Sequence, residues 1–571
     1  MGRTVARRVL AGVVCVLGAA ALAACKNSSD SDFNTVGNPT PRASSGNPPA
    51  PTEGACATQL DASRFGSADE LWAHHVFLDS LKARPTASPS HQAFVDWLDA
   101  RLAEIPGLQR RSTEYEIQRW LERDFALAAG PAGALTAIWS SGSVPYSKQT
   151  SAGGVTAALV YVPVGQAISS VDVAGKIILR EAATGTVPRA AFAALEWWSY
   201  DPELTLITGI AEDYERDFLA YEQRITDLRE AGSGDAAGLI LMHGFPHEQV
   251  KGHYAPYEGE LWPVPALYVG VDEGERLKQV AQAGGQARIR LSADEGPTPT
   301  RTLIATLPGV SAERIVIESH TDGTNVHEDN GPLVMLEMAK YFAAFPKHCH
   351  PKTLEFVFPT AHFHQKIFPP LRHGGAGEYA RQLNRDYEDG TVAMALVLEH
   401  LGTLGYDARP RASGAPGREL VPNGTPEAMS AFVNESPVLI ATLLQSVIAH
   451  DMRGFIALRG ADLPGAHIPL HRSFGGEGTP YSDHLIPTVA YITAPWPLYN
   501  PAFGLEVLDK DLLYRQTLMF TDYVQLISPL SRLLLGGALI PQREARAALC
   551  GSPAGDLFIC AGTPAEPAGG P

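Results

Sequence analysis

Apolar residues recur at helical spacing in the first folded stretch of the chain, from residue 58 to about 125. This spacing predicts a helix that begins after Ser88-Pro89-Ser90. Its apolar face is formed by Phe94, Trp97, Leu98, Leu102 and Ile105. A strand rich in threonine and tyrosine is expected next, at Arg111–Trp120.

The pattern changes between about 135 and 295, where short β-like runs alternate with glycine and proline. The runs are Ala157–Val162, Lys176–Leu179, Ala237–Met242 and Ala266–Val269. One helix is predicted among them, at Glu273–Ala283. We therefore expect a β-rich unit in the middle of the chain.

From Arg301 to about residue 535, strand-like apolar runs alternate with amphipathic helices. This alternation predicts βα units and a largely parallel sheet. The strands expected here are Ile315–Ile317, Leu354–Phe358, Met394–Leu398 and Val489–Ile492. The predicted fold class is α/β, with a mostly parallel mixed sheet flanked by helices and an inserted β-rich domain.

The first 25 residues have the pattern of an export signal. Arg3, Arg7 and Arg8 precede an apolar run at Leu10–Leu22, which is shorter than the ~20 residues of a membrane-spanning helix. Leu22-Ala23-Ala24-Cys25 resembles the bacterial lipoprotein processing site, which implies a lipid on Cys25 and anchoring to the outer face of the cell membrane. The alternative is an ordinary signal peptide with an incidental cysteine. Residues 26–54, rich in Ser, Asn, Pro and Gly, are expected to be a disordered tether.

The overall composition indicates a globular protein and argues against a nucleic-acid-binding function. The 571 residues suffice for about three domains, and 45% hydrophobic with 19% charged residues fits a globular body. The net charge of −17 argues against a nucleic-acid partner, because phosphate binding favours a basic surface.

Four cysteines remain after the signal and the lipidation site: Cys56, Cys349, Cys550 and Cys560. Export permits disulfides. Cys550 and Cys560 flank a short loop and are a natural local pair, and Cys56 with Cys349 would follow by exclusion, although four cysteines allow three connectivities.

Histidines and carboxylates lie next to the predicted strands. His320 with Asp322, His362 with His364, and Glu399 follow strands. Asp329 precedes a helix, and His484 precedes the last strand. Since ligand sites collect beyond the carboxyl ends of parallel strands, this pattern gathers His320, Asp329, His362, Glu399 and His484 at one edge. Imidazole and carboxylate together suit zinc, and Asp322 can orient the imidazole of His320.

The order of these residues resembles the di-zinc aminopeptidase family, which includes glutaminyl cyclases, glutamate carboxypeptidases and the transferrin receptor. Ile304–Gly309 resembles its entry strand, and His320-x-Asp322 matches its first metal motif. Asp329-Asn330 matches its bridging aspartate. Glu399 stands at an acidic ligand position, and Gly476–Thr479 with Ser482-Asp483-His484 resembles its closing segment, whose histidine is a ligand. The resemblance implies one or two zinc ions and a peptide or small amide substrate.

One departure leaves the chemistry open. The family has two adjacent glutamates, a general base and a zinc ligand, where this chain has His362 and Phe363. In a first interpretation His362 replaces the base. In a second, His362 or His364 is a metal ligand of an altered site that can still activate water. In a third, catalysis is lost and the fold serves binding.

The middle unit resembles the protease-associated domain, a module inserted into exported peptidases. The similarity lies in Gly175–Leu179, Val264–Val269, Gly274–Leu277 and Ala283–Gly285. The expected organisation is a signal peptide at 1–24, a tether at 25–57, a helical start of the hydrolase at 58–134, the insert at 135–297, the metal-hydrolase-like domain at 298–540 and a tail at 541–571.

Overall fold

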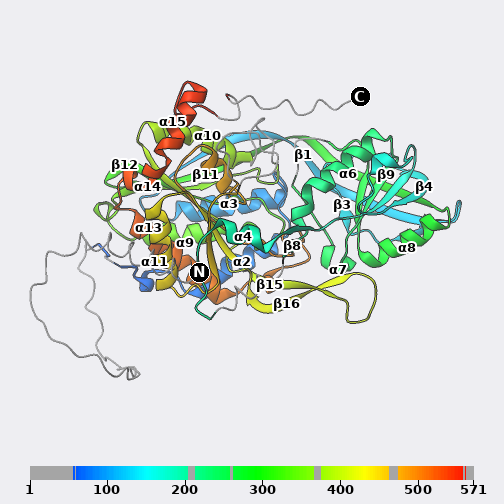
Figure 1. Cartoon of the computed structure of the whole chain (residues 1–571), viewed down its shortest axis with the longest axis horizontal. Coiled ribbons are helices and arrows are strands. Elements are labelled where there is room, and N and C mark those ends of the chain that lie inside the picture. The colour runs from blue at the N-terminus through cyan, green and yellow to red at the C-terminus, as the bar shows by residue number, and fades with distance from the viewer. Residues whose placement is uncertain are drawn as a thin grey trace, which may run out of the picture. The chain divides into compact units, whose positions relative to one another are not determined.

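A sheet lies among the helices of the larger part of the fold (Figure 1). Its strand order is β1-β11-β13-β12-β14-β19-β17-β18-β7, and the inner strands β13 and β14 are buried on both sides. Four neighbours run parallel: β13 (Lys352–Phe358), β12 (Ser311–Glu318), β14 (Val392–Leu398) and β19 (Thr488–Ile492). Beyond them, β17 (Met429–Val433) and β18 (Phe455–Leu458) are parallel to each other, while β17 is antiparallel to β19. The structure confirms the predicted α/β class with a mostly parallel mixed sheet.

The computed structural model describes residues 56–57, 59–203, 213–256, 261–364, 374–461, 473–556 and 560. The expected signal peptide at 1–24, the lipidation site Cys25 and nearly all of the expected tether at 25–57 lie outside these ranges.

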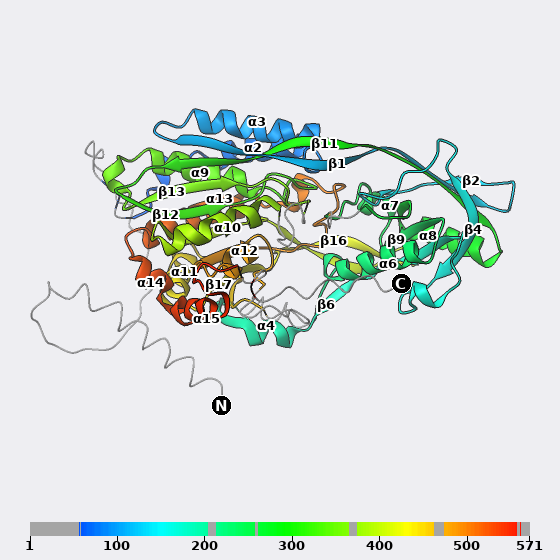
Figure 2. The ribbon, with the colours of Figure 1, turned by 90° about the horizontal axis from the view of Figure 1, so that it is seen from above.

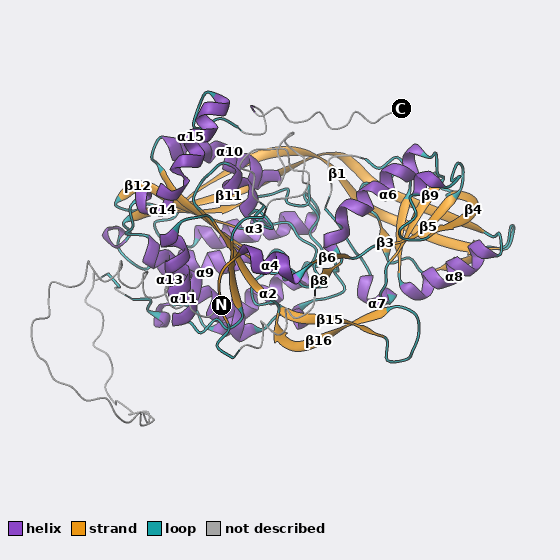
Figure 3. Ribbon diagram, in the orientation of Figure 1, coloured by secondary structure: helices purple, strands orange, loops and turns teal. Residues whose placement is uncertain are grey.

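Helices cover both faces of the sheet (Figure 3). The larger core packs one face against α2 (Ala68–Ser80), α3 (Pro89–Ala103), α9 (Gly331–Ala343), α11 (Pro437–Ala449) and α13 (Lys510–Ile527). The smaller core packs the other face against α10 (Gly374–Glu388) and α12 (Gly478–Asp483). The split follows the two-residue period of a strand, since Ile315 and Ile317 of β12 enter the larger core and Val316 the smaller one. The short helices α14 (Arg532–Gly536) and α15 (Ile540–Cys550) end the described fold.

Two long strands carry the chain from this body into a second lobe (Figure 2). The strands β1 (Gln109–Gly130) and β11 (Gln286–Leu307) pair antiparallel from Gln109 opposite Thr306 to Gly130 opposite Gln286. At one end β11 pairs with β13 of the body, and at the other end it pairs with β4 of the lobe.

The lobe has its own sheet and its own hydrophobic core. Its strands are β2 (Thr136–Ile138), β3 (Gly142–Ser143), β4 (Val155–Val162), β5 (Ile177–Glu181), β9 (Gly238–Met242) and β10 (Ala266–Val269). The helices α6 (Tyr221–Ser233), α7 (His247–Val250) and α8 (Val271–Gln282) accompany them. All four short strands expected from the sequence, and the helix expected at Glu273–Ala283, are present within a few residues.

One segment of the middle unit returns to the body. The strand β7 (Glu196–Tyr200) pairs antiparallel with β18 and forms an edge of the central sheet. Two indole nitrogens fasten it: Trp197 Nε1 donates to the carbonyl of Val433 at 3.1 Å and Trp198 Nε1 to that of Ile440 at 3.2 Å. The helix α4 (Arg189–Leu195) and the two-stranded pairs β6 (Gly185–Val187) with β8 (Tyr214–Arg216) and β15 (Leu404–Pro410) with β16 (Arg418–Pro426) lie outside the main sheets.

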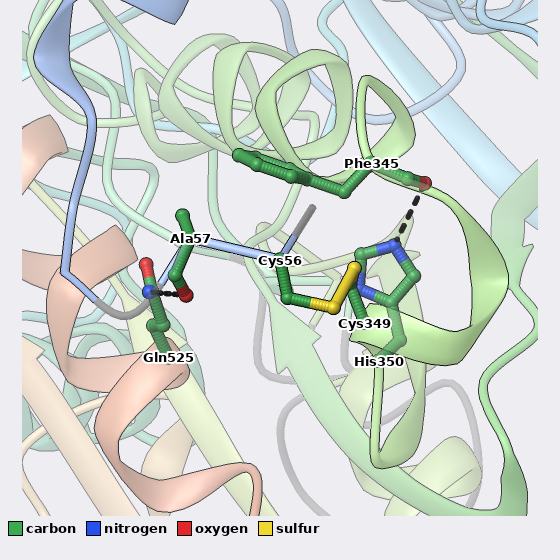
Figure 4. Close-up of a disulfide and its surroundings, with 6 residues drawn as sticks. All are labelled: Cys56, Ala57, Phe345, Cys349, His350 and Gln525. Carbon is green, nitrogen blue, oxygen red and sulfur yellow. Dashed lines mark hydrogen bonds between the residues drawn. A yellow bond between two sulfur atoms is a disulfide. The ribbon is translucent and has the colours of Figure 1, made fainter. Parts of the chain in front are cut away.

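Two disulfides involve the first and the last described residues of the chain. Cys56 is bonded to Cys349, which lies in the turn between α9 and β13 (Figure 4), and Cys550 is bonded to Cys560. Beside the first bond, the amide of Gln525 donates to the carbonyl of Ala57 at 2.9 Å. The first described residues are thereby held on the body by one covalent bond and one hydrogen bond.

Among the described residues, no single helix is both long and apolar enough to span a membrane. The bent pair Lys510–Ile527 and Arg532–Cys550 reaches that length and composition together, but the first of these helices is largely buried in the core.

Candidate metal centre

Histidines and glutamates gather where β12, β13 and β14 end. Because these neighbouring strands are parallel, their carboxyl ends meet at one edge of the sheet. The cluster consists of His320 after β12, His362 after β13, Glu399 and His400 after β14, Glu328 before α9, and Glu477 before α12. All six residues are buried.

Two backbone positions shape this edge. Ala361, directly before His362, has φ +67°, and His400, directly after Glu399, has φ +56°. These left-handed conformations are unfavourable for residues with a side chain and concentrate at functional sites.

In all three histidines of the cluster, Nδ1 lies within hydrogen-bond distance of an oxygen atom. His320 Nδ1 donates to the carbonyl of Asp322 at 2.9 Å, and His362 Nδ1 lies 3.0 Å from Glu477 Oε1. His400 Nδ1 donates to the carbonyl of Thr493. Histidines that bind metals through Nε2 are held in this way, because the bond to Nδ1 fixes the tautomer and the ring orientation.

The Nε2 side of these rings meets carboxylates. His320 Nε2 lies 3.7 Å from Glu399 Oε2 and 3.9 Å from Glu328 Oε1, and His362 Nε2 lies 3.6 Å from Glu328 Oε1. The ligand atoms of His320, His362 and Glu399 all lie within 4.8 Å of one another, and so do those of His320, Glu328 and His400.

Several polar atoms of the cluster have no hydrogen-bond partner among the described residues. They are His320 Nε2, His400 Nε2, Glu328 Oε2 and Glu477 Oε2. Leaving such atoms unpaired in a protein interior costs on the order of 1–3 kcal/mol each. A cation bound among imidazole nitrogens and carboxylate oxygens would satisfy them, and this donor set fits zinc.

Burial and neighbouring charges shift the pKa values of the clustered side chains. Burial lowers the pKa of His362, but the hydrogen bond and charge of Glu477 and the charges of Glu328 and Glu399 outweigh it and raise this pKa to about 10. Burial and the charge of Glu477 raise the pKa of Glu399 to about 8. Burial and the neighbouring His362 and His400 hold the pKa of His320 well below its usual value.

Asp322 acts on His362 rather than on the imidazole of His320. Its carboxylate accepts the backbone N–H groups of His362 at 3.1 Å and Phe363 at 2.9 Å, and the hydroxyl of Thr86. His320 is held by the backbone carbonyl of Asp322 instead. The expected orienting role of the Asp322 side chain is therefore corrected: the carboxylate fixes the turn that carries His362.

Three other expected ligands lie outside the cluster. Asp329 is paired with Arg84, through Nε to Oδ2 at 2.7 Å and Nη2 to Oδ1 at 2.5 Å. His364 Nε2 lies 3.3 Å from the carbonyl of Gln118 in β1. His484 ends α12, where burial and the charges of Arg546 and Arg381 lower its pKa to about 3. The structure thus brings His320, His362 and Glu399 together and adds Glu328, His400 and Glu477. Glu328 and His400 directly neighbour Asp329 and Glu399 in the sequence, and Glu477 belongs to the motif segment Gly476–Thr479.

Comparison with solved structures identifies the fold. An aminopeptidase from Aneurinibacillus sp. strain AM-1 matches 81% of this chain and 94% of its own, with a TM-score of 0.50 and 17% identity. The zinc aminopeptidase BSAP from Bacillus subtilis matches 80% and 94%, with a TM-score of 0.54 and 15% identity. A peptidase M28 precursor from Shewanella amazonensis SB2B matches 80% and 95%, with a TM-score of 0.55 and 15% identity.

These likenesses show that the chain has an M28 aminopeptidase-like fold over about four-fifths of its length. No protein-family model and no curated protein sequence matches the chain.

Proposed function

We propose that this chain is a zinc-dependent hydrolase of peptide or related amide bonds. The observation that carries the proposal is the shared arrangement of His320, His362 and His400, each with Nδ1 held by an oxygen and the ring beside buried carboxylates. The fold, which is that of known zinc aminopeptidases, supports it.

In this proposal His320, His362 and Glu399 would hold the ion. This corresponds to the second interpretation of the sequence, in which His362 is a metal ligand of an altered site. A bound zinc supplies a Lewis acid for the scissile carbonyl and lowers the pKa of water at the site. His362 keeps its proton on Nδ1, facing Glu477, and presents Nε2 to the cluster.

Glu328 is the group that we assign to accept and return the proton of the attacking water. Its Oε1 lies within 3.9 Å of Nε2 of both His320 and His362, and its Oε2 has no partner among the described residues. This assignment replaces the expectation that His362 is the base, because the Nδ1 of His362 is engaged by Glu477 and its Nε2 is needed for the ion.

The middle lobe is proposed to be a protease-associated domain that helps to orient the substrate. It reaches the site through Tyr254, whose N–H donates to the carbonyl of Tyr499 at 3.0 Å and whose ring lies 5.8 Å from that of Phe363, next to His362. Nearby, His253 Nδ1 lies 2.7 Å from the side-chain oxygen of Asn500.

Export and lipid anchoring on Cys25 complete the proposal. The N-terminal motif supports them, as does the position of Cys56, at the end of the expected tether, which is bonded to the body through Cys349.

The test is metal analysis of the full-length protein together with hydrolysis of a panel of aminoacyl and peptide amides, with and without a chelator. Bound zinc and chelator-sensitive hydrolysis are expected. Zinc without hydrolysis of any amide in the panel would favour the alternative, a binding protein on the same fold. A chain that holds no zinc would refute the proposal.

A further inference from the structure

Arg84 is a fully buried cation next to the candidate metal centre. It precedes α3 and lies beside the loop after β12, where its backbone N–H donates to the carbonyl of Gly323 at 2.7 Å and its carbonyl accepts the Gly323 N–H at 3.2 Å. A side chain at position 323 would not fit, since a Cβ there would lie 2.3 Å from Glu328 Oε2 and 2.9 Å from the Cβ of Asp329. The absence of a side chain lets Arg84 and the two acidic residues approach the same point.

Every N–H donor of the Arg84 guanidinium is used. Nε and one Nη2 hydrogen go to the two oxygens of Asp329, and the second Nη2 hydrogen goes to the carbonyl of Asn325 at 2.7 Å. Nη1 donates to the carbonyl of Leu78 at 3.1 Å and to that of Lys82. A guanidinium held on all sides is a fixed part of the site rather than a mobile side chain.

The partner of Arg84 is the residue that the family resemblance marks as the bridging ligand between two zinc ions. As a bridge, Asp329 would bind one ion through each oxygen, and here a guanidinium binds both oxygens side by side, so that its positive charge opposes a cation at the same carboxylate. The position that the resemblance assigns to a glutamate ligand holds Phe363, whose ring is 1% exposed and offers no ligand atom. A second zinc therefore lacks both its bridge and a ligand.

We propose that Arg84 takes the place of the second metal ion, so that this chain binds one divalent cation and not two. The inference rests on the proposed function for the one ion that the cluster does bind. The guanidinium supplies a permanent positive charge to Asp329, which would otherwise be a buried unpaired carboxylate. The single ion is held by His320, His362 and Glu399, and Asp329 is not among its ligands.

The experiment is zinc stoichiometry of the full-length protein by elemental analysis and by titration calorimetry. The wild-type chain is expected to bind one zinc, and Asp329→Asn is expected to keep that one zinc with an affinity changed less than 10-fold. Arg84→Ala is expected to gain a second, weaker zinc. Arg180→Ala is the matched control, because Arg180 forms a two-point pair with Asp227 in the lobe that is nearly as buried, and this variant should still bind one zinc.

The outcomes separate the two proposals. Two zinc ions in the wild-type chain would overturn the role of Arg84 and leave the proposed function standing. One zinc in both the wild-type chain and Arg84→Ala would also overturn it, as would loss of zinc in Asp329→Asn. If Arg84→Ala fails to fold without metal, added zinc should restore its folding, whereas it should not restore that of Arg180→Ala. No zinc in the wild-type chain would refute the proposed function and the one-ion arrangement with it.

Discussion

The imidazole rings of His320 and His362 stack with their centroids 3.9 Å apart and their planes 11° from parallel. The rings come from the ends of the neighbouring strands β12 and β13, and both reach Glu328 Oε1 with Nε2. Two imidazoles in this arrangement would repel each other if both were protonated, so the pair is suited to share one positive charge. In the proposed metal site, His362 would supply a ligand at a place where the family resemblance implies a glutamate pair.

The first prediction is that zinc binding depends on a histidine of the cluster, His320, and not on His484. His320→Ala should lose the bound zinc and lower hydrolysis by about 100-fold or more, because it removes a proposed ligand at the centre of the cluster. His484→Gln should retain zinc, since His484 lies beside Arg546 and Arg381. Elemental analysis and amide hydrolysis of the two variants check this. Loss of zinc in His484→Gln would restore the ligand set that the resemblance implied.

The position of the cluster was predictable, whereas its exact members were not. The apolar runs of β12, β13 and β14 were visible in the sequence, and parallel strands bring the residues at their carboxyl ends to one edge. This reasoning placed His320, His362 and Glu399 correctly relative to the strands. It could not reveal that Arg84 pairs with Asp329, because 245 positions separate them and no periodic pattern links a loop before α3 to a loop before α9. Their places near strand ends and the family motifs marked Asp329 and His484 as ligands, whereas in the folded chain Asp329 pairs with Arg84 and His484 lies beside Arg546 and Arg381.

The second prediction concerns the proton on His362. Glu477, Glu328 and Glu399 hold the pKa of His362 at about 10 against its burial, so at pH 8 the metal-free imidazole carries a proton that zinc must displace. Glu477→Gln removes a charge and should lower this pKa. We expect the wild-type chain to release about one more proton per zinc at pH 8 than the variant.

Titration calorimetry in buffers of different ionisation enthalpy measures the proton release. Glu435→Gln is the control, because Glu435 is exposed and belongs to the same body. Equal proton release in the wild-type chain and Glu477→Gln would show that Glu477 does not control the charge of His362.

The third prediction compares the two disulfides. Cys56–Cys349 closes a separation of 293 residues and Cys550–Cys560 one of 10 residues. Because a longer loop loses more unfolded-state entropy, Cys56→Ser should lower the free energy of unfolding by roughly 5 kcal/mol and Cys560→Ser by roughly 3 kcal/mol. Urea unfolding without reductant checks the order of the two variants. The differences from the wild-type chain should vanish in reductant, and a larger loss in Cys560→Ser would contradict the loop-length argument.

The fourth prediction uses a buried histidine far from the cluster in the sequence. Burial lowers the pKa of His75 in α2 from 6.5 to about 4, even though Nδ1 donates to the carbonyl of Leu71 at 2.9 Å. In the unfolded chain His75 takes up its proton below about pH 6.5. The unfolded state therefore binds more protons between these values, so the stabilising contribution is present above pH 6.5 and is lost as the pH falls towards 4.

The free energy of unfolding of the wild-type chain should consequently fall by roughly 2–3 kcal/mol more than that of His75→Leu between pH 7.5 and pH 4.5. Urea unfolding at the two pH values measures the difference, with His348→Gln as a control at an exposed position. The control should follow the wild-type chain. Equal losses in the wild-type chain and His75→Leu would mean that the folded protein accommodates a charged His75, and that its acid sensitivity arises at the other buried histidines.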